Sequence, residues 1–160
     1  MSIEHKIYVI GEYWDRPAQI SLSGMELDPT FPLVDCSIEI ETFAYRFCGK
    51  FSIQAEGLTK FISHLETIIS TNEGAAHLQN YTEESRLAFF ATGNAGGEII
   101  VEGEISNLSV VMDDRIYRDI AVNSNRNSSG IYVRFGGIET DQSYIQASLE
   151  GFKALKRYLK

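Results

Sequence analysis

The sequence predicts an α+β fold in which residues 1–160 form a single domain, an antiparallel or mixed β-sheet with two amphipathic helices packed on one face. Short segments in which apolar and polar residues alternate, as in strands, recur along the chain. Two longer segments place their apolar residues at helical spacing instead. Apolar residues make up 44% of the chain and charged residues 22%, which is the composition of a folded globular protein.

The first predicted strands alternate with loops rich in proline and glycine. Residues 3–10 alternate weakly and predict a short strand, and a second strand is expected near residues 20–22. Residues 34–55 alternate clearly, and one face of this segment starts with Cys36, Ile38 and Ile40. The apolar parity inverts at Phe43, so we expect a bulge or a turn near residues 41–42.

Two segments predict helices. The apolar residues of the first recur at helical spacing and are Leu58, Phe61, Ile62, Leu65, Ile68 and Ile69. This pattern stops before Asn72 and Gly74, which suit a helix end. The second helix follows Asp141 or Thr140, either of which can serve as its N-cap. Its apolar stripe consists of Tyr144, Ile145, Leu149, Phe152, Leu155 and Leu159.

Further strands are expected at residues 87–92, 98–106, 108–112 and 131–135, and the polar run at 113–130 predicts a loop. The stretch GNAGGE, residues 93–98, joins the first two. Its glycines resemble a phosphate-binding loop, but the lysine and hydroxyl of that motif are missing and a strand follows where the motif needs a helix. We therefore expect a hairpin connection with residues at positive φ.

The charge and the N-terminus restrict the class of partner and the compartment. The formal net charge is −8, which disfavours a protein that binds nucleic acid directly. It suits a basic protein partner, because an acidic surface attracts one, and it also suits solubility alone. No apolar run approaches the ~20 residues that span a membrane, and the first residues lack the features of a signal peptide. The cytoplasm is the expected compartment.

No residue pattern indicates catalysis, a cofactor or a metal. The three histidines lie far apart in different predicted elements, without a second ligand at metal-binding spacing. Cys48 has only Arg46 and Lys50 as nearby cations, and we expect both on the opposite side of its strand. No serine lies in a GxSxG turn. The prediction is therefore a non-enzymatic protein.

The strand after the glycine corner carries the candidate binding residues. Glu98, Glu102 and Glu104 share one face of that strand, while the alternate residues are apolar and face the core. This face is either a solvated outer surface of the sheet or an acidic docking surface for a basic protein. The candidate partner-binding residues are Glu98, Glu102, Glu104, Asp113, Asp114 and Tyr117.

The order of scaffold positions from residue 43 to residue 159 resembles a known family. The positions in the first part are Tyr45-x-Phe47-x-Gly49-x-Phe51-x-Ile53, then the helix with Leu58, Phe61 and Leu65, then Gly74-x-Ala76-x-Leu78. Those in the second part are Leu87-x-Phe89, Gly97, Ile99-x-Val101-x-Gly103, Ile131-x-Val133-x-Phe135, and Asp141-Gln142-Ser143 before the helix with Leu149, Phe152 and Leu155. Together they resemble the WapI-like immunity proteins of bacterial polymorphic toxin systems.

This resemblance implies a small cytoplasmic protein that binds a cognate toxin domain and neutralises it, protecting the cell that makes the toxin. A basic nuclease domain is one kind of toxin that would fit. Such families have no catalytic residues to transfer, and their toxin contacts differ between members, so no site residue is carried over. The alternative function is a non-enzymatic module that binds a ligand or acts as a scaffold.

Overall fold

The computed structural model describes residues 2–10, 19–41, 46–82, 85–111 and 131–159. The strands of this part of the chain are β1 (Ser2–Ile3), β2 (Ile7–Ile10), β3 (Gln19–Leu27), β4 (Leu33–Glu41), β5 (Arg46–Gln54), β6 (Ala75–Gln79), β7 (Arg86–Ala91), β8 (Glu98–Val111) and β9 (Ile131–Asp141). The helices are α1 (Ala55–Thr71) and α3 (Gln142–Lys156). The predicted α+β class is confirmed.

All strand pairs are antiparallel, and they form one sheet in the order β1-β3-β4-β5-β8-β7-β6, with β2 beside β3 and β9 beside β8. The long strand β8 joins two parts of this sheet. Its first residues pair with β7 and β9, whereas residues 109–111 pair with residues 46–48 of β5. We call β1–β5 the N-terminal half-sheet and β6–β9 the C-terminal half-sheet.

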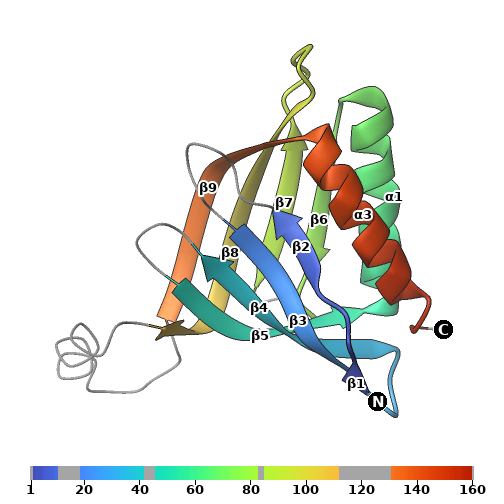
Figure 1. Cartoon of the computed structure of the whole chain (residues 1–160), viewed down its shortest axis with the longest axis vertical. Coiled ribbons are helices and arrows are strands. Elements are labelled where there is room, and N and C mark those ends of the chain that lie inside the picture. Colours follow the sequence, from blue (N-terminus) through green and yellow to red (C-terminus); the bar gives the residue numbers. More distant parts are fainter. Residues whose placement is uncertain (1, 11–18, 42–45, 83–84, 112–130, 160) are drawn as a thin grey trace, which may run out of the picture.

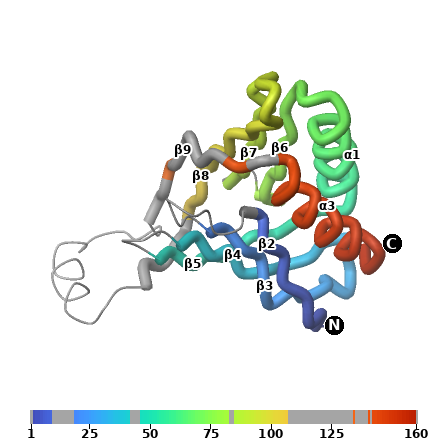
Figure 2. Tube along the Cα trace, turned by 45° about the horizontal axis from the view of Figure 1, so that its top comes forward, coloured from blue at the N-terminus to red at the C-terminus, as the bar shows by residue number. Residues whose placement is uncertain are grey.

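Both helices lie on the same side of the molecule, next to each other (Figure 1). The view in Figure 2 shows the same neighbourhood, with the two half-sheets to the left of the helices. The core between them includes an aromatic cluster that joins three elements. The ring of Phe61 in α1 lies 5.5 Å from that of Phe89 in β7 and 5.0 Å from that of Phe152 in α3. All three side chains are fully buried.

Helix α3 packs closely on β2 because small and polar residues face that strand. The buried Oγ of Ser148 lies 2.6 Å from the carbonyl oxygen of Tyr8 and 2.9 Å from that of Val9. At Gly151 a Cβ atom would come within 3.1 Å of the side chain of Ile7. The glycine that weakens the helical pattern therefore allows the helix to approach the strand.

Several predicted elements are confirmed, with changes to their bounds. Both helices form where the spacing predicts them, and α1 ends at Asn72, whose φ of 55° is left-handed. Glu41 pairs with Arg46, so β4 and β5 are antiparallel neighbours on either side of the predicted inversion of parity. Phe43 itself lies outside the described residues.

Three expectations about strands were wrong or incomplete. Residues 108–111, expected to belong to a separate strand at residues 108–112, instead continue β8. The pairing of β8 with β9 has two irregularities, one of them between Ile105 and Leu108. The first predicted strand is divided into β1 and β2. Strand β6 was not predicted, because its five residues are short and rich in alanine.

Candidate functional site

The GNAGGE stretch forms the corner between β7 and β8, as predicted. Gly93 and Gly97 have φ values of 73° and 67°, a region that favours glycine. The corner is closed by a hydrogen bond from the backbone N of Thr92 to the carbonyl oxygen of Glu98, 3.1 Å. The side-chain amide of Asn94 donates to the Glu98 carboxylate at 2.8 Å. The glycines therefore allow the chain to turn into β8, and Asn94 holds the carboxylate of Glu98, the first residue of that strand.

The C-terminal half-sheet has an inner face in contact with the helices and an outer face. On β8 the inner side chains Ile99, Val101 and Ile105 are fully buried, whereas Glu102 is exposed and Glu98 is partly exposed. The three glutamates named by the sequence thus project from the same side of β8. We define the outer face by the residues His77, Arg86, Ala88, Phe90, Glu98, Ile100, Glu102, Glu104 and Arg134.

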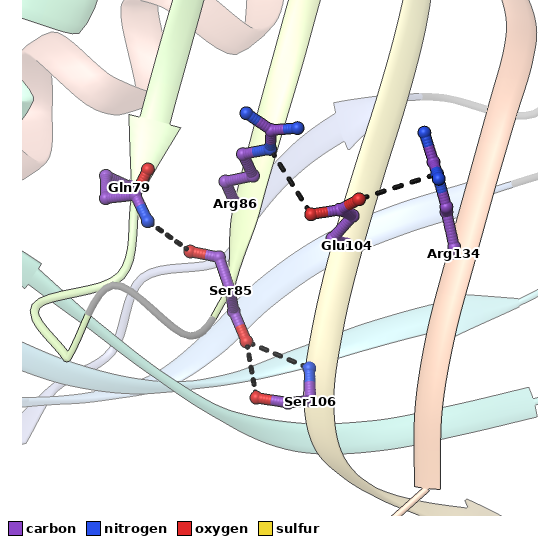
Figure 3. A network of polar contacts seen from close by, with 6 residues as sticks. All are labelled: Gln79, Ser85, Arg86, Glu104, Ser106 and Arg134. Atoms are coloured by element: carbon purple, nitrogen blue, oxygen red, sulfur yellow. Dashed lines mark hydrogen bonds and ion pairs between the residues drawn. The ribbon is translucent and has the colours of Figure 1, made fainter.

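Glu104 lies between two arginines from the neighbouring strands (Figure 3). Its carboxylate is 3.6 Å from Nε of Arg86 in β7 and 3.4 Å from Nε of Arg134 in β9. The register places these three residues opposite one another. The predicted acidic face is therefore not uniform, because at this end two positive charges surround one negative charge.

A second group of polar contacts holds the start of β7 against β8 (Figure 3). The backbone N of Ser106 donates to Oγ of Ser85 at 3.0 Å, and the Gln79 amide donates to the carbonyl oxygen of Ser85 at 3.3 Å. Ser85 is buried and directly precedes Arg86. These bonds keep Arg86 in register with Glu104.

The side chain of Glu102 differs from that of Glu104 in having no hydrogen bond or ion pair to any other described residue. Beside it lies a small hollow of about 60 Å³. The lining consists of His77, Arg86, Ala88, Phe90, Glu102, Gly103, Glu104 and Arg134. Small-molecule sites usually measure ~300–1,000 Å³. The hollow is therefore of a size for one side-chain head group rather than for a nucleotide.

A larger groove of about 490 Å³ lies at the β3–β4 turn, beside residues 158–159. Phe31 and Tyr158 line it and are 64% and 48% exposed. The turn is held by Asp28, whose carboxylate accepts the backbone N–H groups of Thr30 and Phe31 at 2.7 and 2.9 Å. These bonds lower the pKa of Asp28. Phe31 is thus held at the surface by an ordered turn.

Cys48 shares its side of β5 with Arg46, contrary to the expectation, because residues two apart in a strand project to the same side. Both contact Glu39, with Arg46 Nη2 at 2.7 Å and the Cys48 thiol at 3.7 Å. Burial, followed by the Glu39 charge, raises the pKa of Cys48, so its thiol stays protonated. Burial raises the pKa of the other free cysteine, Cys36, to about 12.

The candidate residues Asp113, Asp114 and Tyr117 lie outside the described residues. The residues that sequence reasoning missed are Arg86 and Arg134. Arg134 lies on the polar parity of the strand expected at residues 131–135, which is a signal that it faces outward, whereas Arg86 precedes the strand expected at residues 87–92. The alternation within a strand, however, does not predict which other strands it pairs with.

Among the described residues, no group of three or more His, Cys, Asp and Glu side chains could hold a metal ion. Within the same residues, neither helix has the length and apolar character needed to cross a membrane. Comparison with protein-family models, with curated proteins and with solved structures gives no match.

Proposed function

We propose that this protein is an immunity protein of the cytoplasm that binds a cognate toxin domain and neutralises it. One observation carries the proposal: three carboxylates, those of Glu98, Glu102 and Glu104, project from a sheet face that neither helix covers. The formal net charge of −8 would extend the attraction for a basic toxin beyond this face. The scaffold order that resembles the WapI-like immunity proteins supports the same function.

The function is tested by co-expressing the protein with the toxin domain encoded beside it. An immunity protein should co-purify with that domain and restore growth to cells that express it. A toxin that neither co-purifies with the protein nor loses its toxicity would contradict the function.

The site is tested separately with Glu102→Lys, since Glu102 has no partner among the described residues and its replacement should leave the fold intact. The substitution should weaken toxin binding about tenfold or more, because it puts a like charge against a basic partner. The matched control is Glu26→Lys, which makes the same change in net charge at an exposed position of β3. Equal affinities for both variants would remove the proposed site while leaving the function in place.

The groove beside Phe31 favours a second function, a ligand-binding or scaffolding module. Its volume of about 490 Å³ falls within the range of small-molecule sites. A module of this kind would show NMR shifts at Phe31 and Tyr158 on addition of small aromatic compounds, with loss of the shifts in Phe31→Ala. A spectrum unchanged across a library of such compounds would argue against it.

A further inference from the structure

The charges on the outer face are separated along β8. Glu98 and Glu102 lie toward the start of the strand. Arg86 and Arg134 flank its next acidic residue, Glu104, further along. Six residues of strand span roughly 20 Å, about the length of a short extended segment of a partner. The first end carries two negative charges and the second carries two positive charges and one negative charge.

The groups at both ends remain available for further contacts. The side chains of Arg86 and Arg134 are 51% and 74% exposed, and each approaches Glu104 through Nε. Figure 3 shows the two terminal nitrogens of Arg86 directed away from Glu104. Because a guanidinium has five N–H donors, each arginine keeps donors for a carboxylate of a partner.

Within the acidic end, between Glu98 and Glu102 along β8, lies an apolar pair that a partner could cover. Phe90 and Ile100 are paired across β7 and β8 and are only partly buried. The ring of His77 stands edge-on to that of Phe90, with centroids 5.8 Å apart. Apolar area flanked by charged groups is the usual arrangement of a protein contact, in which burial supplies affinity and charge supplies orientation.

We propose that the outer face binds its partner in one orientation, with a basic segment over Glu98 and Glu102 and an acidic group over Arg86 and Arg134. This proposal rests on the proposed function and adds the chemistry of the toxin surface: basic and acidic groups that fit within the roughly 20 Å from Glu98 to Glu104. In the reverse orientation the basic segment would meet two arginines and the acidic group two glutamates. The repulsion between these like charges makes binding in the reverse orientation less favourable.

The competing explanation is that the Arg86–Glu104–Arg134 row serves only the sheet, as a cross-strand charge ladder. The two explanations differ in what a bound peptide would do. A ladder leaves the face without a preferred direction for a charged ligand, whereas a docking surface aligns it.

The test uses a synthetic peptide with a lysine half and a glutamate half, joined by glycine, that carries a nitroxide label at its lysine end. In NMR spectra of the full-length protein, the label should broaden the amides near Glu98 and Glu102 more than those of Arg86 and Arg134. Moving the label to the glutamate end should reverse the pattern. Equal broadening at both ends, broadening confined to another surface, or no broadening at millimolar peptide would overturn the proposal.

The double variant Arg86→Gln, Arg134→Gln should weaken peptide binding about two- to fivefold for each arginine and abolish the preferred orientation. The control is Arg157→Gln, an exposed arginine near the chain end, which should keep the orientation. Unfolding curves show whether each variant is folded before it is used. A toxin that binds the wild type and the double variant equally would overturn this inference and leave the immunity function standing.

Discussion

At the scale of single residues, the glycine corner shows which backbone positions need glycine and which do not. Gly93 and Gly97 have positive φ values, whereas Gly96 does not. A Cβ atom on Gly97 would also approach the side chain of Gln142 to 2.9 Å, while one on Gly93 or Gly96 would meet nothing within 4 Å. The corner therefore contains two positions that require glycine and one, Gly96, that would accept another residue.

We expect Gly97→Ala and Gly93→Ala each to lower the free energy of unfolding by about 1 kcal/mol, because an L-residue is disfavoured at these φ values. Gln142 is flexible enough to move away, so the two variants should be similar. Gly96→Ala is the control and should change stability little. Urea unfolding measures all three, and a Gly96→Ala variant as unstable as the others would contradict this account of the corner.

Glu39 gives a prediction about pH. Its pKa is lowered, first by the hydrogen bond from Arg46. A carboxyl group whose pKa is lower in the folded state stabilises the fold above its ordinary pKa of 4.5, and this contribution is lost as the pH falls through the folded value. Glu39→Gln should therefore reduce stability at neutral pH and flatten the loss of stability below about pH 4.5.

Thermal unfolding measured across this pH range tests the role of Glu39. Glu26→Gln is a suitable control, because Glu26 is exposed on the next strand and forms no ion pair with the described residues. If the profiles of the two variants coincide at all pH values, the contact with Arg46 does not contribute to acid stability.

At the scale of elements, one side chain in the apolar stripe of α1 contacts both the sheet and α3. Phe61 contacts Phe89 and Phe152, so it links α1 with β7 and α3. Helical spacing predicts that Phe61 is buried, whereas the ring contacts depend on the packing of three elements distant in sequence.

Phe61→Ala should lower the free energy of unfolding by about 3–5 kcal/mol, the range for removing a buried phenylalanine. The matched control is Phe31→Ala, which removes the same side chain at a position that is 64% exposed, so its stability should remain within about 0.5 kcal/mol of wild type. Denaturant titrations compare the two. Similar losses for both variants would show that burial does not decide the effect.

At the scale of the whole molecule, the net charge of −8 bears on how fast a basic partner would associate. Attraction between oppositely charged surfaces can raise the association rate constant to about 10⁸–10⁹ M⁻¹s⁻¹ at low salt. The Debye length falls from ~30 Å at 0.01 M to ~8 Å at 0.15 M ionic strength. Because most of these charges lie away from any single contact, salt should affect the approach more than the bound state.

For the complex with the co-purified toxin domain, we expect the association rate constant to fall about tenfold or more over this range of salt, with a smaller change in the dissociation rate constant. Stopped-flow fluorescence measures both. An association rate constant independent of salt would mean that acidic steering plays no part in the encounter, whatever the affinity of the complex.

The sequence by itself determined the fold class, both helices and the side of β8 from which its glutamates project. These properties follow from local periodicity: Leu58 and Phe61 repeat as a helix requires, and Ile99 and Val101 lie on the parity opposite to that of the glutamates, as a strand requires. The glycines of the corner likewise predict a hairpin, because the ability to adopt positive φ values is a property of the single residue.

Only the tertiary structure decided that Arg86 and Arg134 stand on either side of Glu104. These residues come from three strands, and the order of strands depends on how the whole sheet pairs rather than on the pattern of any one strand. The same is true of β8, whose continuous path past residue 108 is maintained by its pairing with β5. A charged face is thus predictable from alternation, but the distribution of its charges is not, since cross-strand neighbours are distant in sequence.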